Sequence, residues 1–317
     1  MLESNNIQRN KDFLMTAFVL IGPIIVLIVA FILTKIVVDE KEVPDNINEG
    51  FVNTLEVGED FEDIDIQAMS AYVKELESGK ILYAKKANES IPLASLTKMM
   101  TALTAIEVLG REGDVVVRKE NLDMEGDNGF HINEVFKLKN ITDLTLVSSS
   151  NDGASAIASA IGSILPTDDN SSVNQMNDFA KRIGMSATRF KNETGLDVDE
   201  TTPGAKGSAK DMTILMEYIL NNYPYLLEAT VEPTFNTTSI NGFEYEVTNT
   251  NNIVGSLPNI VGSKTGYTDL AGGNLAVVIN PGLNNPVAIV VLGSTIDGRF
   301  DDVDRLAKAV FQYYLSE

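Results

Sequence analysis

The segment from Pro92 to Thr101 begins a long helix-forming stretch that carries a serine and a lysine among apolar residues. Ser95 and Lys98 are three residues apart, which is close to one helical turn, so their side chains lie on one face and can meet. Apolar residues then recur until Gly110 ends the stretch, at Leu96, Met99, Met100, Leu103, Ile106 and Leu109. The pattern predicts a mostly buried helix at the centre of a domain, with Ser95 at its N-terminus.

Ser95 and Lys98 are residue types that together can form a nucleophile and its base. A serine hydroxyl reacts poorly unless a base lies beside it. A lysine is such a base only if its pKa falls, through burial or through another nearby cation. A helix N-terminus also favours negative charge that develops there. An isolated Ser-x-x-Lys is equally the start of an ordinary helix with serine as its N-cap, so the catalytic interpretation requires further motifs.

Two more motifs follow along the chain. Ser149 and Asn151 form Ser-x-Asn, and residues 264–266 read Lys-Thr-Gly. Each motif is short and is a weak signal by itself. The three motifs in this order are the signature of class A β-lactamases and penicillin-binding proteins, and they favour the catalytic interpretation of Ser95 and Lys98.

From about Ile66 to the C-terminus, the chain resembles the serine-type D-alanyl-D-alanine carboxypeptidases, which are low-molecular-mass penicillin-binding proteins. Beyond the three motifs, the resemblance is carried by residues 72–83, 176–180, 184–185, 188–192, 194–197, 271–273 and 298–299. It implies an α+β, serine β-lactamase/transpeptidase-like fold, in which an antiparallel sheet lobe built from both chain ends faces a helical lobe. The resemblance also implies an active site in the cleft between the two lobes.

The coarse pattern of the chain is consistent with two lobes. Apolar periodicity predicts helices in the middle of the chain and one closing helix, at 154–164, 173–184, 208–222 and 300–314. Segments of strand character lie towards both ends, at 69–76, 80–85, 260–263, 274–279 and 287–293. A hairpin is predicted around Asn241 and Gly242.

The resemblance implies a catalytic role for five motif residues. Ser95 is the expected nucleophile, which forms an acyl-enzyme, and Lys98 is the expected base. Lys264 is expected near Lys98, so that Lys98 is neutral for part of its time. Ser149 is expected to relay a proton towards the leaving amine, and Asn151 to bond the substrate amide and position Lys98.

The same resemblance implies a substrate-binding set. Lys264 and Thr265 are expected to hold the substrate carboxylate, and Gly266 to let the substrate backbone lie close to the strand, because a Cβ atom would obstruct it. The oxyanion hole is expected from the backbone N–H groups of the nucleophile and of Tyr267. Arg299 matches a family arginine that helps to bind the terminal carboxylate; the alternative is a surface arginine at the start of the last helix.

Composition excludes several other classes of site. The formal net charge of −21 argues against nucleic-acid binding. The chain has no cysteine, which excludes thiolate metal sites and cysteine nucleophiles. Its one histidine, His131, argues against a multi-histidine metal site, and a surface or packing role is expected for it. The implied mechanism requires no metal and no organic cofactor.

The N-terminal part of the chain indicates a membrane anchor. Residues 13–34 carry no charge, and 22 residues at ~1.5 Å per residue cross a hydrocarbon core of about 30 Å. No small-x-small cleavage site follows this run, so an uncleaved anchor is expected. We therefore expect a cytoplasmic tail at 1–12, a transmembrane anchor at 13–38, an acidic linker at 39–65 and a catalytic domain at 66–317.

Arg9 and Lys11 precede the apolar run and Lys35 and Lys41 follow it, so charge barely decides its orientation. Peptidoglycan lies outside the cytoplasmic membrane, and a single-pass protein with an extracytoplasmic catalytic domain is expected for that reason. The expected activity is removal of the terminal D-Ala from peptidoglycan stem peptides, with β-lactams as inhibitors.

Three alternatives remain open at this point. The first is a D,D-endopeptidase of the same family. The second is a serine β-lactamase, because Glu193 begins a Glu-Thr-Gly-Leu-Asp segment similar to the Glu-x-x-Leu-Asn of class A enzymes. Asn192, Gly195 and Leu196 match the Asn-x-x-Gly-Leu element of the carboxypeptidases instead, so we interpret Glu193 as incidental. The third is a catalytically dead binding protein.

Overall fold

The computed structural model of the chain describes residues 61, 64–126, 128–165, 171–282 and 284–316. All of them belong to the second of two units, residues 54–317. The expected tail at 1–12, the expected anchor at 13–38 and most of the expected linker at 39–65 lie outside the described residues. No helix in the described part of the chain is long and apolar enough to cross a membrane.

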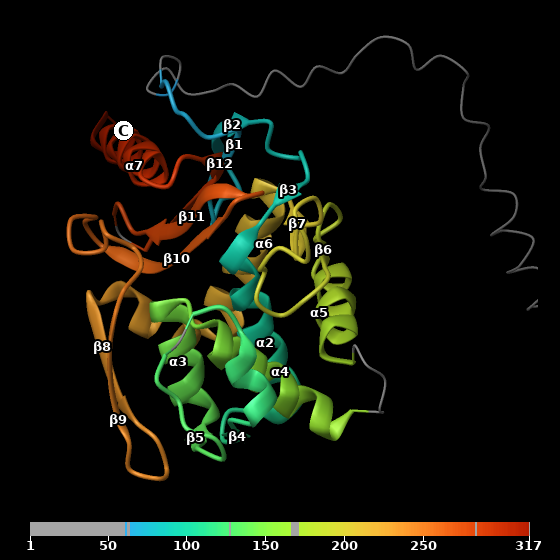
Figure 1. Ribbon diagram of the computed structural model, residues 1–317. Coiled ribbons are helices and arrows are strands. Elements are labelled where there is room, and N and C mark those ends of the chain that lie inside the picture. Colours follow the sequence, from blue (N-terminus) through green and yellow to red (C-terminus); the bar gives the residue numbers. More distant parts are fainter. Residues whose placement is uncertain (1–60, 62–63, 127, 166–170, 283, 317) are drawn as a thin grey trace, which may run out of the picture. The chain divides into compact units, whose positions relative to one another are not determined.

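An antiparallel five-stranded sheet joins early and late segments of the unit (Figure 1). Its strand order is β10-β11-β12-β1-β2, and the two halves meet where Ser70 pairs with Leu292. The bounds are β1 Ser70–Glu75, β2 Ile81–Lys85, β10 Ile260–Thr268, β11 Gly272–Ile279 and β12 Val287–Ser294. The prediction of a sheet built from strands near both ends is therefore confirmed.

The sheet is buried on both faces. Successive side chains of its central strands point to opposite sides, and both sets are buried. On β12, Ala288, Val290 and Leu292 pack into one hydrophobic cluster, and the alternate residues pack into a second cluster. Helix α7 (Gly298–Ser316) covers the second face and helix α6 (Ala209–Asn222) covers the first (Figure 1). The near-continuous apolar sequence of β11 and β12 follows from this double coverage.

Helix α2 (Thr97–Leu109) is the central helix of the helical lobe, as predicted. Its residues from Thr97 to Ile106 are all buried, and Gly110 ends it with a φ of 72°. It packs against α3 (Leu138–Ser148), α4 (Asn151–Ile164), α5 (Ser171–Arg182) and α6. Small residues of α4, among them Ala154 and Ala156, are fully buried and let α2 and α4 approach closely.

Short elements complete the unit. The predicted hairpin is present as β8 (Thr234–Thr238) and β9 (Glu244–Thr248), and Gly242 in its turn has a φ of 89°. The remaining strands are β3 Ile91–Pro92, β4 Asp114–Val116, β5 Val135–Lys137, β6 Arg189–Phe190 and β7 Ala205–Gly207. The 3-10 helices are η2 Ala94–Leu96, η3 Lys119–Asp123, η4 Pro224–Leu226 and η5 Glu228–Val231.

One predicted strand ends too early. The apolar pattern indicated a strand at 260–263, whereas β10 continues to Thr268. Its second half pairs with β11 residue by residue, from Lys264 opposite Ala276 to Thr268 opposite Gly272. This pairing places the whole Lys-Thr-Gly motif on an edge strand of the five-stranded sheet.

Candidate active site

Ser95 lies in η2, the single turn that precedes α2. The turn is held between two close backbone neighbours, and glycine is required in both. A Cβ atom on Gly195 would lie 1.9 Å from the Ala94 carbonyl oxygen, and one on Gly266 would lie 3.1 Å from the backbone nitrogen of Ser95. The helix start, the segment around Gly195 and strand β10 therefore meet at the serine.

Lys98 is bonded to Ser95. Its Nζ donates to Ser95 Oγ at 2.7 Å and to the carbonyl oxygen of Thr194 at 2.9 Å. The lysine side chain is fully buried, and this burial lowers the pKa of Lys98 to about 7, against the opposing effect of the Glu193 carboxylate. Near neutral pH a large fraction of Lys98 is therefore neutral and can accept the proton of Ser95.

A second serine and lysine form a matching pair. Ser149 follows the last residue of α3 in the left-handed region, with a φ of 63°, and the next residue, Ser150, caps α4. Lys264 Nζ donates to Ser149 Oγ and to the Thr265 carbonyl oxygen, each at 2.9 Å. Because a non-glycine residue in this region is strained, the helix ends on both sides must hold Ser149 in place.

Lys264, like Lys98, has a lowered pKa. Burial lowers its pKa well below the usual range, and the positive charges of Lys98 and Arg299 lower it further. The predicted neighbourhood of the two lysines is therefore present. Burial is the larger cause of the lowered pKa in both, and mutual repulsion acts in addition at Lys264.

Asn151 begins α4 and points one end of its amide at a backbone carbonyl. Its Nδ2 donates to the Glu125 carbonyl oxygen at 2.7 Å, while its Oδ1 is buried and has no partner within the described part of the chain. Asn151 was expected to position Lys98, but Lys98 donates to Ser95 and Thr194 instead. The open Oδ1 is an acceptor of the kind that a substrate N–H group requires.

Strand β10 presents the expected substrate-binding residues in order. Thr265 is buried and its hydroxyl lies 2.6 Å from that of Thr250, Gly266 packs directly on the turn of Ser95, and Tyr267 is 45% exposed. As an edge strand, β10 has backbone groups that no neighbouring strand of the sheet pairs. Such an edge accepts an extended peptide.

Arg299 lies behind this strand rather than on the surface. Its side chain is 8% exposed, and its guanidinium donates from one terminal nitrogen to the Gly266 carbonyl oxygen at 2.8 Å. The alternative of a surface arginine is therefore wrong. Arg299 fixes the backbone of the Lys-Thr-Gly motif and adds positive charge beside Lys264.

The structure adds three residues that the sequence did not single out as site residues. Thr194 supplies the carbonyl that holds Lys98, and Thr250 supplies the hydroxyl that contacts Thr265. Glu193, interpreted as incidental, acts on the charge of Lys98, and its own pKa is raised by burial. The Asn-x-x-Gly-Leu element signalled the segment of Thr194 and Glu193, whereas no motif pointed to Thr250.

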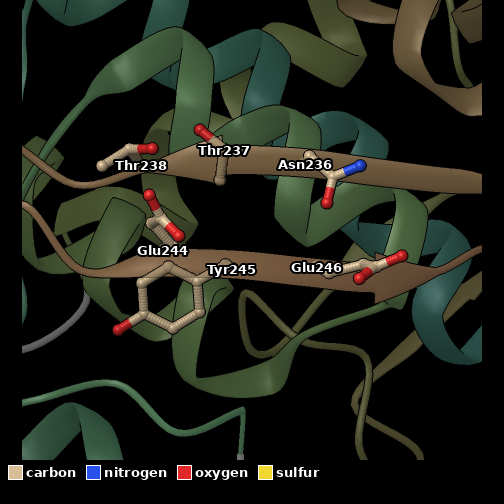
Figure 2. A pocket seen from close by; sticks show the side chains of 6 residues that line it. All are labelled: Asn236, Thr237, Thr238, Glu244, Tyr245 and Glu246. Carbon is tan, nitrogen blue, oxygen red and sulfur yellow. The ribbon is translucent and has the colours of Figure 1, made fainter.

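Pockets lie both beside and away from this cluster. One of about 230 Å³ includes Tyr267 and is lined further by Glu125, Leu196, Asp197, Thr268 and Asp269. Another of about 380 Å³ lies on the β8–β9 hairpin, where Glu244 pairs across the strands with Thr238, and it contains none of the predicted site residues (Figure 2). Near the hairpin turn, His131 is 57% exposed and stacks on Phe243 with ring centroids 4.1 Å apart, which confirms its expected surface or packing role.

Comparison with protein families matches residues 56–295 to Peptidase_S11, D-alanyl-D-alanine carboxypeptidase. The D-alanyl-D-alanine carboxypeptidase DacF of Bacillus subtilis (strain 168) is 30% identical over 78% of this chain and 63% of its own length. A D-alanyl-D-alanine endopeptidase of Escherichia coli (strain K12) is 30% identical over 72% of each chain. The chain thus spans less than two thirds of DacF.

Solved structures show the same fold. Penicillin-binding protein D2 from Listeria monocytogenes, in its cefotaxime-bound form, superposes with a TM-score of 0.67 at 27% identity. The match covers 78% of this chain and 99% of that one. The expected fold of penicillin-binding proteins, with its sheet and its helices, is thereby confirmed for the described residues, while the expected N-terminal transmembrane helix lies outside them.

Proposed function

We propose, from the premise that the chain belongs to the Peptidase_S11 family of D-alanyl-D-alanine carboxypeptidases, that it cleaves the terminal D-Ala from peptidoglycan stem peptides through an acyl-enzyme on Ser95. The observation that carries this proposal is the 2.7 Å hydrogen bond between Lys98 Nζ and Ser95 Oγ, in a buried site where the pKa of Lys98 is about 7. A nucleophile and a base at this distance are the minimum that acyl transfer requires.

In the acylation step, Ser95 Oγ attacks the carbonyl carbon of the scissile D-Ala–D-Ala bond and its proton passes to neutral Lys98. The oxyanion is held by the backbone N–H groups of Ser95 and Tyr267, a type of stabilisation that is worth ~100–1,000-fold in rate per donor. The C–N bond then breaks as Ser149, bonded to Lys264, passes its proton to the leaving amine. The proton that Lys98 took from Ser95 replaces the one that Ser149 gave up, so that Lys98 is neutral and Ser149 is protonated again. Water hydrolyses the resulting ester and restores Ser95.

The carboxylate of the leaving D-Ala meets a positively charged wall. Arg299 supplies positive charge, and the Thr265 hydroxyl supplies a directed donor. The negative charge of the bound carboxylate favours the ammonium form of Lys264, against the burial that lowers its pKa. A β-lactam carries its carboxylate in a similar place relative to its reactive amide, so the same site is proposed to bind penicillins. The cefotaxime-bound form of the related protein D2 supports this part of the proposal.

An endopeptidase activity is the second candidate. It is favoured by the 30% identity to the Escherichia coli D-alanyl-D-alanine endopeptidase, which extends over 72% of both chains. The reacting groups are the same for both activities, so the distinction rests on the substrate. A carboxypeptidase releases D-Ala from a monomeric pentapeptide, whereas only an endopeptidase splits a cross-linked dimer.

The catalytic domain, residues 66–317, is proposed to be held outside the cytoplasmic membrane by a single anchor at 13–38 and the acidic linker at 39–65. The uncharged run at 13–34 and the extracytoplasmic location of peptidoglycan support this arrangement. Protease added to intact spheroplasts is expected to remove the domain. Full protection of the domain would refute the arrangement.

The first test is covalent labelling of the full-length chain in detergent with a fluorescent penicillin. A long-lived adduct on Ser95, located by mass spectrometry and absent from Ser95→Ala, is the expected result. An adduct that clears within seconds would identify a β-lactamase instead. A wild-type chain that folds but never labels would favour a catalytically dead binding protein.

A further inference from the structure

Thr250 connects the two halves of the proposed site. Its hydroxyl lies 2.6 Å from the Thr265 hydroxyl on β10. On its other side, its backbone N–H donates to the Val147 carbonyl oxygen at 3.1 Å, and its hydroxyl lies 3.4 Å from the same oxygen. Val147 is in the last turn of α3, where carbonyls have no helical donor, so Thr250 caps the helix that leads to Ser149.

The backbone around Thr250 is fixed by a buried amide. Asn249 is 7% exposed, and its Nδ2 donates to the carbonyl oxygens of Thr230 and Glu232, each at 2.9 Å. Its Oδ1 accepts from the backbone N–H of Asn251 at 2.9 Å. Since all of these partners are held at once, the Thr250 hydroxyl cannot drift away from β10.

The same network fixes the strand that Thr250 contacts. The backbone N–H of Ser263 donates to the Thr230 hydroxyl at 3.0 Å, and the Ser263 hydroxyl donates to the Thr230 carbonyl oxygen at 3.1 Å. Thr230 therefore connects Asn249 to the residue that precedes Lys264. The hydrogen bonds of Thr230 thus hold the backbone next to Thr250 and the strand that carries Thr265, and so fix the distance between the two threonine hydroxyls.

Only one of two hydroxyls in contact can donate to the other. When Thr250 donates, the Thr265 oxygen is an acceptor, and the hydrogen of Thr265 must point elsewhere. We propose that Thr250 is a positioning residue, which donates to Thr265 so that the Thr265 hydroxyl donates to the carboxylate of the substrate. This inference rests on the proposed D,D-peptidase function and deepens it.

In the absence of substrate, the Val147 carbonyl is an alternative acceptor for the Thr250 hydrogen, and Thr265 then donates to Thr250. Arrival of a carboxylate reverses the direction of the hydrogen bond between the two threonines, with no movement of heavy atoms. Without the Thr250 hydroxyl, the Thr265 hydrogen has no fixed orientation. The expected loss therefore falls on substrates that carry the carboxylate.

The test is Thr250→Val, which keeps the shape of the side chain and removes the hydroxyl. For a peptide that ends in D-Ala-D-Ala, KM is expected to rise about tenfold with little change in kcat, as for a lost hydrogen bond to a charged group. For the same peptide with a C-terminal carboxamide, the ratio of variant to wild-type kcat/KM is expected to stay near one. Thr250→Ser is expected to restore the wild-type KM.

Thr248→Val is the matched control, because Thr248 is exposed on β9 and the substitution is the same. Equal losses on the two peptides, or no loss on either, would overturn the positioning role while leaving the proposed function intact. If Thr250→Val fails to fold, Thr250→Ala is measured with the same pair of peptides. A wild-type chain that neither releases D-Ala nor is acylated by penicillin would refute the proposed function, and the positioning role with it.

Discussion

At the scale of single residues, the chemistry of the site depends on the protonation states of two buried lysines. Lys98 and Lys264 are both shielded from water, and each is bonded to a serine. Desolvation favours the neutral amine, and an adjacent carboxylate favours the ammonium. Glu193 is that carboxylate for Lys98, so its charge opposes the effect of burial. The balance between these two effects determines the pH at which Lys98 accepts a proton.

A first prediction concerns the pH dependence of acylation. The rate of labelling by penicillin is expected to rise with pH through about 7 as Lys98 loses its proton. In Glu193→Gln the ammonium form loses its stabilising neighbour, so the pKa of Lys98 falls and the rise shifts to lower pH. Stopped-flow labelling between pH 5 and pH 9 measures the shift; these limits are about two units to either side of neutrality.

Glu200→Gln removes the same charge from an exposed site in the same segment, and it should leave the pH profile unchanged. A Glu193→Gln profile that coincides with the wild type, or moves to higher pH, would contradict the electrostatic role of Glu193.

A second prediction tests the base itself. Lys98→Ala is expected to slow acylation by ~100–10,000-fold, because it removes the group within hydrogen-bond reach of the Ser95 proton. Lys139→Ala, on helix α3 and bonded to Asp143, is a control for loss of a helical lysine. An acylation rate close to the wild type in Lys98→Ala would exclude this lysine as the base.

At the scale of elements, the contact between the segment of Gly195 and the turn of Ser95 decides the position of the nucleophile. Gly195 has a φ of 80° and lies directly on the Ala94 carbonyl. Gly195→Ala is expected to move the turn, to slow penicillin acylation by more than tenfold and to lower the free energy of unfolding by about 2 kcal/mol or more. Gel-based labelling and urea unfolding measure these two effects.

Gly184→Ala separates the contact from the backbone strain. Gly184 also has a positive φ, of 92°, but a Cβ atom there would meet nothing within 4 Å. Its substitution is expected to cost about 1 kcal/mol and to leave the acylation rate unchanged. If both variants slowed acylation equally, the contact of Gly195 with the turn would not position Ser95.

The elements also show what the sequence could and could not predict. Helix α2, the β8–β9 hairpin and strands β11 and β12 were predictable, because their apolar periodicity or turn residues are local signals. The second half of β10 lacks such a signal, since it reads Lys-Thr-Gly, and only its pairing with β11 makes it a strand. Thr194 acts through a carbonyl that lies 96 residues along the chain from Lys98, and Thr250 through a hydroxyl that lies 15 residues from Thr265. No local pattern encodes either contact.

At the scale of the whole unit, one buried carboxylate ties together segments from both ends. Asp302 on α7 accepts from the backbone N–H groups of Gln67 and Ala68, each at 2.8 Å, and from the Ser294 hydroxyl at 2.6 Å. Asp302→Asn retains only one acceptor oxygen, so at least one of the three donors loses its partner. A loss of about 1–3 kcal/mol in the free energy of unfolding is expected, measured by urea denaturation.

The neighbouring Asp301 is exposed, so Asp301→Asn is the control and should change stability by less than about 0.5 kcal/mol. Equal stability of Asp302→Asn and the wild type would show that the three hydrogen bonds of Asp302 do not stabilise the contact between the two ends of the unit.

The pairing of β1 with β12 has a consequence for how the protein is made. Ser95 and Lys98 leave the ribosome long before Lys264 and Arg299, and β1 has only β2 as a neighbour until β12 is synthesised. Sheet pairing between such distant segments is slow, because the chain between them must first be brought together. A nascent chain therefore carries its serine in a latent form. It can become reactive only after almost the whole polypeptide has emerged, when β12 pairs with β1 and Lys264 on β10 reaches Ser149.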